Sequence, residues 1–231
     1  MKKAIRPDVP KTLRKNASKW RKELLDAIKE ESAGGNPIPD KLYKRYAHAS
    51  IREALQKMYS DRCCYCEAPI KVVSSDHIEH RMPKAKMCFP EHTFDWDNLH
   101  LACSKCNGAK SNKWNHDEPI LDAAVDKIED HLDYKEGGLG LYRWPKTLRG
   151  ETTISHADLD REPLLNARTS VYLSALCAIR EINEEYTSSP KSPTLAAGVR
   201  QLQAKAVGDF GSVMEYAMRV WLDNGVLAGN V

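Results

Sequence analysis

The sequence predicts a mostly helical α+β protein with a small metal-organised module embedded between helical N- and C-terminal regions. Apolar residues recur at helical spacing on both sides of a middle segment rich in Cys, His, Asn and turn residues. The length of 231 residues favours one compact core with an extension. We therefore divide the chain into residues 1–60, a basic arm with helices, residues 61–116, the metal module, and residues 117–231, a helical region.

The composition excludes several classes of protein. Hydrophobic residues make up 42% and charged residues 29% of the chain, as in an ordinary globular protein rather than a disordered or collagen-like one. No apolar run approaches the ~18 residues of a membrane-spanning helix, and the N-terminus lacks the apolar stretch of a signal peptide. We expect a cytoplasmic protein with no membrane partner.

Positive charge is concentrated at the start of the chain. Lys and Arg number 35 and Asp and Glu number 32, which leaves a net charge of +3, but residues 1–30 hold ten basic against four acidic side chains. A basic arm of this kind fits contact with a polyanion. A solvated helix face accounts for it equally well.

Two helices are expected before the metal module. The first has Asn16 as a candidate cap and ends at a Gly-Gly pair. The second follows the NPIPD loop, with Asp40 as its cap, and runs to about Asp61. Residues 69–75, PIKVVSS, can supply one short strand.

Helical spacing returns after the module. It is weak around Ala123 to Leu132 and, past the Gly-rich EGGLGLYRWP segment, strong from Pro163 to Tyr186, where the proline suits a first helical turn. After the SSPKSPT break, a last helix is expected from Leu195 to Trp221. Gly208 and Gly211 weaken that prediction without overturning it.

Seven cysteines in a chain without an export signal favour metal ligands over disulfides. Four of them form two CxxC pairs, the arrangement of a closed tetrahedral zinc site: Cys63, Cys66, Cys103 and Cys106. The 36 residues between the pairs exceed the roughly 15 to 20 of a simple zinc ribbon, so the site would clasp an inserted segment. From the cysteines alone, a structural zinc knuckle without catalysis is the simpler interpretation.

The segment inside this clasp contains an ordered series of polar motifs. Asp76, His77 and Ile78 come first, Asp97, Asn98 and Leu99 follow, and the run ACSKCN closes the series, with a lysine three residues on. This series resembles the HNH endonuclease motif, which is carried on the ββα-metal fold and in many members is supported by the same pair of CxxC knuckles. The resemblance covers about residues 63–113 and implies hydrolysis of phosphodiester bonds.

The resemblance implies a role for each motif residue. His77 is the general base, since an imidazole with a pKa of about 6.5 can accept a proton from water at neutral pH. Asp76 and Asn107 are the ligands of a catalytic Mg²⁺ or Mn²⁺. Asn98 bonds the loop backbone and holds His77 in place. Many HNH enzymes have His where this chain has Asn107, which makes the site an HNN form that suits Mg²⁺.

Further side chains near the motif are candidates for contacts with phosphate or with the cation. Four basic residues are candidate phosphate contacts, with ordinary exposed surface charge as the alternative: Lys110, Arg81, Lys84 and Lys86. His80 or His92 would complete the cation site if Asn107 does not. A surface or loop-ordering role is the alternative for both histidines.

The flanks extend the resemblance. The basic arm, the NASKW helix and the phrases DHIEHRMPK, RWPKTLRGETTI and PLLNARTSVY are similar in layout to the retron-associated HNH family and the related PtuB family of Septu systems. This implies the nuclease subunit of an antiphage defence complex with a PtuA-like ATPase, docked through the helical flanks. DNA is the expected substrate and tRNA the alternative. The competing class is a non-catalytic, zinc-dependent nucleic-acid-binding module.

Overall fold

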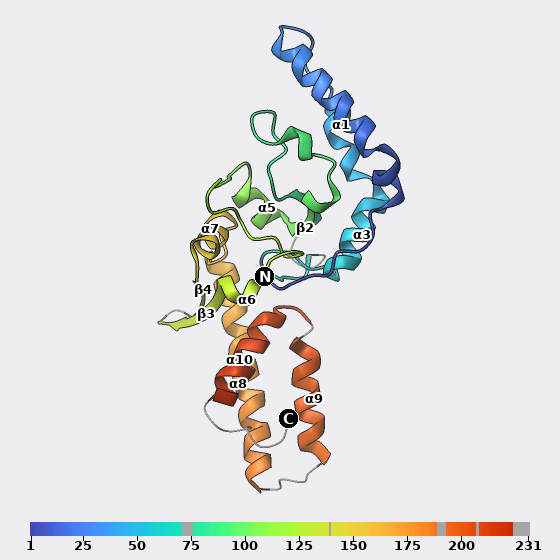
Figure 1. The fold of residues 1–231 in the computed structure, drawn as a ribbon. Helices are drawn as coiled ribbons and strands as arrows, with labels where there is room; N and C mark the ends of the chain where they lie inside the picture. Colours follow the sequence, from blue (N-terminus) through green and yellow to red (C-terminus); the bar gives the residue numbers. More distant parts are fainter. Residues whose placement is uncertain (71–75, 139, 189–192, 207, 224–231) are drawn as a thin grey trace.

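The computed structural model describes residues 1–70, 76–138, 140–188, 193–206 and 208–223. The molecule is elongated, with α1 (Lys11–Ser32) at one end, the metal module in the middle and α8 to α10 at the other end (Figure 1). The N-terminus lies beside the module, between it and the helices α8 to α10 (Figure 1). None of the helices in the described ranges is long and apolar enough to cross a membrane. Most of the strand expected at residues 69–75 falls outside the described residues.

The N-terminal helices differ from the expected pair in their boundaries. Helix α1 begins directly after Pro10, so Asn16 lies inside the helix and donates to the Thr12 carbonyl oxygen (2.9 Å) instead of capping it. Proline suits the start of a helix because it has no N–H to satisfy. The expected second helix is split into α2 (Asp40–Tyr43), the 3₁₀ turn η1 (Lys44–Ala47) and α3 (Ala49–Tyr59). The His48 side chain caps α3 by accepting the Ser50 N–H.

The metal module has the expected ββα order. Strand β1 (Asp76–His80) pairs antiparallel with β2 (Leu99–Cys103), in a register that sets Asp76 opposite Cys103. Helix α5 (Ser104–Lys110) follows β2 without a gap. The connection between the strands contains two 3₁₀ turns, η2 (Pro90–His92) and η3 (Trp96–Asn98). This arrangement confirms an α+β fold with a small ββα module between helical regions.

The helix expected around Ala123 to Leu132 is wrong except for one turn, α6 (Ile128–His131). The chain continues into an antiparallel hairpin of β3 (Leu132–Gly137) and β4 (Gly140–Pro145), followed by α7 (Leu148–His156). Alternate residues Leu132 and Tyr134 are buried, which is the period of a strand. Gly140 has a φ of +143°, a conformation that L side chains rarely adopt, and so permits the turn.

The C-terminal region ends in three packed helices, α8 (Glu162–Ser188), α9 (Pro193–Ala206) and α10 (Gly211–Asp223). Pro163 lies in the first turn of α8, as predicted. The expected last helix is divided in two at Phe210, whose positive φ of 53° does not occur within an α-helix. Gly211 permits the close approach of the chain to the Ala206 carbonyl oxygen, because a Cβ at this position would lie 2.0 Å from that oxygen. The described core of this region is apolar and includes Ile179, Leu202, Val213 and Ala217.

Candidate active site and metal centre

The four predicted ligand cysteines come together in one cluster. Their Sγ atoms all lie within 4.8 Å of one another, and all four residues are buried. Zinc–sulfur bonds of about 2.3 Å require Sγ separations of about 3.8 Å in a tetrahedral site, and the Sγ atoms of Cys66 and Cys103 are 3.9 Å apart. Two thiols come from the loop after α3 and two from the junction of β2 and α5. The donor set therefore fits a closed structural zinc site.

Asp76 is held by α3, an element that precedes the module. Arg52 places Nη1 2.8 Å from Oδ1 and also donates to the Asp76 carbonyl oxygen (3.1 Å), while Gln56 donates to Oδ2 (3.0 Å). Burial raises the pKa of Asp76, but the bonds and charge of Arg52 outweigh burial, so the pKa lies below its ordinary value. The carboxylate is ionised at neutral pH, and both of its oxygens are engaged from α3.

His77 lies on the side of β1 opposite Asp76, the side on which α5 with Asn107 packs. Successive strand residues point to opposite faces, so His77 shares a face with Glu79, whose carboxylate meets Lys110 of α5 (2.7 Å). Residues three apart lie on one helix face, so Asn107 shares the face of α5 that carries Lys110. Both side chains are half-buried. The packing of α5 on β1 brings the candidate base and the last motif residue to the same end of the module, beside the cysteine cluster.

Asn98 fastens the loop between the two strands. Its Oδ1 accepts the Met82 N–H (2.7 Å), and its Nδ2 donates to the carbonyl oxygens of Met82 (3.0 Å) and His92 (3.1 Å). The residue is buried. These contacts fix the chain just beyond the end of β1; a consequence for His77 remains a prediction.

Lys110 is buried inside the module, contrary to its predicted role as a phosphate contact. Its side chain is fully buried, and Nζ binds Glu79 Oε1 (2.7 Å) and the His80 carbonyl oxygen (2.8 Å). Tyr65 also donates to Glu79 Oε1 (3.3 Å). Burial raises the pKa of Glu79, and the charge of Lys110 opposes that rise. The expected phosphate contact of Lys110 is wrong, because the ammonium group neutralises a buried carboxylate.

The other three candidate phosphate contacts also have partners within the chain. Arg81 lies 3.4 Å from Asp122 and donates to the Ile120 carbonyl oxygen (3.1 Å). Lys86 forms an ion pair with Glu31 of α1 (2.7 Å), and Lys84 lies over the ring of Tyr46 (5.2 Å). These three cations fasten the module to its neighbours. Contact of any of them with phosphate remains a prediction that requires the cation to be shared.

The two additional histidines take part in loop contacts. His80 is buried with Nε2 2.9 Å from the Thr93 carbonyl oxygen, and burial together with the charges of Lys84 and Lys110 lowers its pKa to about 3. The ring is therefore neutral and donates to Thr93. His92 Nδ1 lies 2.6 Å from Asp95 Oδ2. These contacts favour the loop-ordering role over cation binding.

Arg6 anchors the basic arm to the middle of the motif. Its Nη1 donates to the carbonyl oxygens of Trp96 (2.7 Å) and Leu99 (3.0 Å), and its guanidinium lies 5.3 Å from the centre of the Trp96 ring. The arm thus lies against the module rather than extending away from it. The excess of positive charge in residues 1–30 predicts a binding arm, but no local sequence pattern indicates that Arg6 binds the carbonyl oxygens of Trp96 and Leu99.

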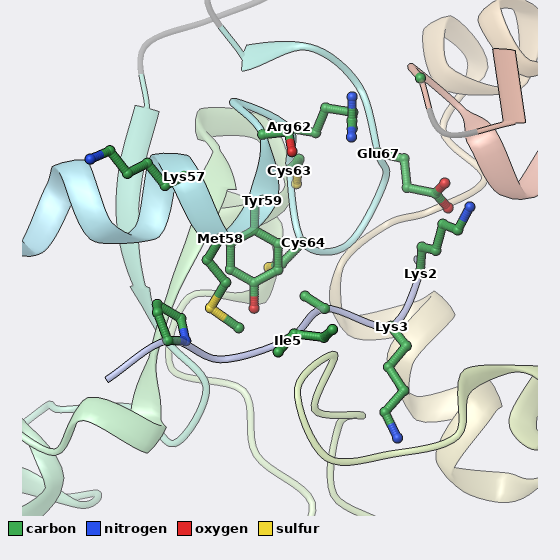
Figure 2. Close-up of a pocket in the computed structure, with 14 residues that line it drawn as sticks. Lys2, Lys3, Ile5, Lys57, Met58, Tyr59, Arg62, Cys63, Cys64 and Glu67 are labelled. Carbon is green, nitrogen blue, oxygen red and sulfur yellow. The ribbon is translucent and has the colours of Figure 1, made fainter. Parts of the chain in front are cut away.

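A groove of about 450 Å³ lies between this arm and the end of α3 (Figure 2). The ring of Tyr59 and the side chain of Met58 line its centre, and Ile5 lies beside them (Figure 2). Lys3 and Lys57 are exposed at its edges. Lys2 and Lys3 of the arm therefore border the module on the side of α3.

Comparison with known proteins agrees with this geometry. Residues 63–113 match the family model for HNH endonucleases. The chain is 27% identical to Septu protein PtuB of Bacillus mycoides (strain KBAB4), over 65% of this chain and 59% of that protein. It is 29% identical to Septu protein PtuB of Bacillus thuringiensis, over 68% and 53% respectively. It is also 25% identical to Septu protein PtuA of Bacillus mycoides (strain KBAB4), over 65% of this chain and 23% of that protein.

The two kinds of match differ in what they cover. The family model spans the residues that form the cysteine cluster, the β1–β2 pair and α5. The similarity to the PtuB proteins extends into the flanks, although the chain spans little more than half the length of those relatives. Residues 63–113 of this chain are therefore an HNH endonuclease domain, set in a chain similar to the PtuB proteins of Septu systems.

Proposed function

We propose that this protein is a metal-dependent HNH endonuclease that hydrolyses phosphodiester bonds of DNA as the nuclease subunit of a Septu- or retron-type antiphage defence complex. The observation that carries the proposal is the packing of α5 on β1 through Glu79 and Lys110, from which we infer that His77 and Asn107 lie at one end of the module, next to the cysteine cluster. A module that only bound nucleic acid would have no need of an imidazole at that position.

The chain's own residues divide the work of hydrolysis. His77 accepts a proton from the attacking water, since a neutral imidazole is a suitable base near pH 7. Asn98 holds the loop after β1 through its three backbone contacts. Asp76 and Asn107 offer the hard oxygen ligands that suit Mg²⁺ or Mn²⁺, which when bound neutralises charge on the phosphate. Because Asp76 faces α3, on the side of β1 opposite Asn107, its carboxylate would have to leave Arg52 and Gln56 to share one cation with Asn107.

Zinc is the proposed occupant of the cysteine cluster. Four buried thiols whose Sγ atoms lie within 4.8 Å of one another suit Zn²⁺, and such a closed site leaves no position for substrate. Its role is to hold the loop after α3 against the start of α5, and so to supply folding free energy to the module.

The proposed partner is a PtuA-like ATPase. Proteins named for both Septu components, PtuA and PtuB, match this chain, and their names motivate the defence role. The helices α8 to α10, which extend away from the β1–β2 module in Figure 1, are the proposed docking surface. The substrate is nucleic acid, with DNA favoured and tRNA the alternative, and a cytoplasmic location remains a prediction.

The decisive experiment follows DNA and small RNA in cells that express the chain with a PtuA-like ATPase during phage challenge. Wild type is compared with His77→Ala and with His116→Ala, which removes an exposed imidazole just outside the family match. If either DNA or small RNA is fragmented in wild type and in His116→Ala but stays intact in His77→Ala, the result supports the nuclease and identifies its substrate.

The opposite outcome supports a different class of protein. If His77→Ala protects cells as well as wild type and both pools stay intact, the module binds nucleic acid without cutting it. Fragmentation confined to tRNA keeps the catalytic assignment and replaces DNA as the substrate.

A further inference from the structure

Glu67 occupies an unusual position in the first CxxC turn. It directly follows Cys66 and has a positive φ of 66°, a conformation that favours glycine. Its carboxylate is buried and accepts bonds from Arg143 Nη2 of β4 (3.0 Å), the Ser212 N–H at the start of α10 (3.0 Å) and the Ser212 hydroxyl. The amino nitrogen of Met1 lies 2.5 Å from Oε1. A residue that is strained locally thus makes contacts with distant segments, beside the groove of Figure 2.

Arg161 makes a corresponding contact with the second CxxC turn. Its Nη1 donates to the Sγ atom of Cys106 (3.4 Å) and to the Asp158 carbonyl oxygen (2.8 Å). Arg161 directly precedes α8. A cationic donor beside four thiolates offsets part of their negative charge and orients one of them.

Both contacts come from outside the HNH domain. Arg143, Arg161 and Ser212 belong to the C-terminal region and Met1 to the N-terminal arm, whereas the four cysteines lie within residues 63–113. We propose that the metal cluster is also the site at which the C-terminal region docks, so that metal retention and docking stabilise each other. Arg161 is a positioning residue for Cys106, and Glu67 is the anchor for β4 and α10.

Thermodynamic linkage makes the coupling reciprocal. If docking favours metal binding by some factor, then metal binding favours docking by the same factor. Loss of a polar contact to a metal ligand commonly weakens metal affinity by about 10- to 100-fold. The inference rests on zinc at the cysteine cluster and does not depend on nuclease activity.

The first test measures zinc release from the full chain to a chromogenic chelator. We expect Arg161→Gln to release zinc about tenfold faster than wild type or more. Arg219→Gln is the matched control, because it removes an ion pair between α10 and Asp133 of β3 without touching the cysteine loops. Release from Arg161→Gln at the rate of wild type would overturn the proposal.

Glu67→Gly separates docking from local strain. Glycine removes the backbone strain at a positive φ, so a cysteine loop that acted alone would hold zinc at least as well. Because the variant also removes the contacts with Arg143, Ser212 and the Met1 amino group, we expect faster zinc release. Unchanged or slower release contradicts the anchoring role.

Hydrogen exchange tests the coupling in the wild-type chain, so the result does not depend on whether a variant folds. Removal of zinc is expected to speed exchange at β4 and at the first turn of α10, relative to the far end of α1. Unchanged exchange at β4 and α10 after zinc removal would refute the coupling. The zinc content of the purified wild type, expected to be one ion per chain, tests the metal site separately.

Discussion

The metal module and the C-terminal helices are stabilised in different ways. The module buries charged and polar side chains, among them Glu79, His80, Asn98 and Lys110, each with a specific partner. The described buried residues of α8 to α10 are apolar except for Arg168. Apolar packing tolerates small changes, whereas a buried polar group that loses its partner leaves a large penalty. The module should therefore be the more fragile half of the molecule.

The largest expected effect is the loss of a metal ligand. Cys103→Ser removes one of four thiolates, and because zinc supplies on the order of 10 kcal/mol of folding free energy in such modules, the module should unfold. Zinc content and circular dichroism measure the result. Cys177→Ser, at an exposed cysteine of α8, is the control and should keep both zinc and fold. A soluble, zinc-free and fully folded Cys103→Ser protein would contradict this prediction.

The next effect concerns the buried ion pair. Lys110→Met leaves the Glu79 carboxylate buried beside Tyr65 without its cation, which should lower the free energy of unfolding by about 3 to 5 kcal/mol. Chemical denaturation of the zinc-loaded chain measures it.

A second substitution distinguishes lost charge pairing from lost packing. Combining Lys110→Met with Glu79→Leu removes both charges and should recover most of the stability. If Lys110→Met is as stable as wild type but binds nucleic acid more weakly, Lys110 contacts phosphate after all, contrary to its buried position in the structure.

A smaller effect should appear as acid sensitivity of the module. The pKa of His80 is about 3 in the folded chain, against an ordinary value of about 6.5. Below pH 6.5 the unfolded chain binds a proton that the folded chain does not, so stability falls as the pH falls. His80 alone should make the chain about 2 kcal/mol less stable at pH 5 than at pH 8. His80→Gln should flatten the curve of unfolding free energy against pH; an equally steep curve argues against a buried neutral His80.

The smallest expected effect concerns the ion pair between Arg52 of α3 and Asp76. Arg52→Met should raise the pKa of Asp76, because the ion pair keeps that pKa below its ordinary value. The stabilisation by this pair is present above the unfolded pKa and is lost as the pH falls through the folded one. Since the pair is partly exposed, the loss should be under about 1 kcal/mol. Carbon NMR of the Asp76 carboxyl group measures the shift, with Arg45→Met, which affects Glu23 instead, as control; an unchanged pKa would show that Arg52 has no such role.

Several features could be read from the sequence because they depend on local spacing. Two CxxC pairs identify the four ligands, since each pair folds into one turn wherever the rest of the chain lies. Pro163 and the apolar positions of α8 identify that helix through its period. The hairpin of β3 and β4 was missed because its alternating stretch is short and a helix fits the preceding residues almost as well.

The fates of individual charges depended on three-dimensional packing. Lys110, Lys86 and Arg81 look alike in the sequence, yet one is fully buried on Glu79 and the others bind segments far along the chain. The same holds for Arg161 at Cys106 and Arg52 at Asp76. The spacing within each CxxC pair and the period of a helix are encoded by neighbours along the chain, and so the sequence alone predicted the cysteine cluster and α8. Burial and ion pairing are set by residues distant in sequence, so only the folded chain shows which cations remain available to a substrate.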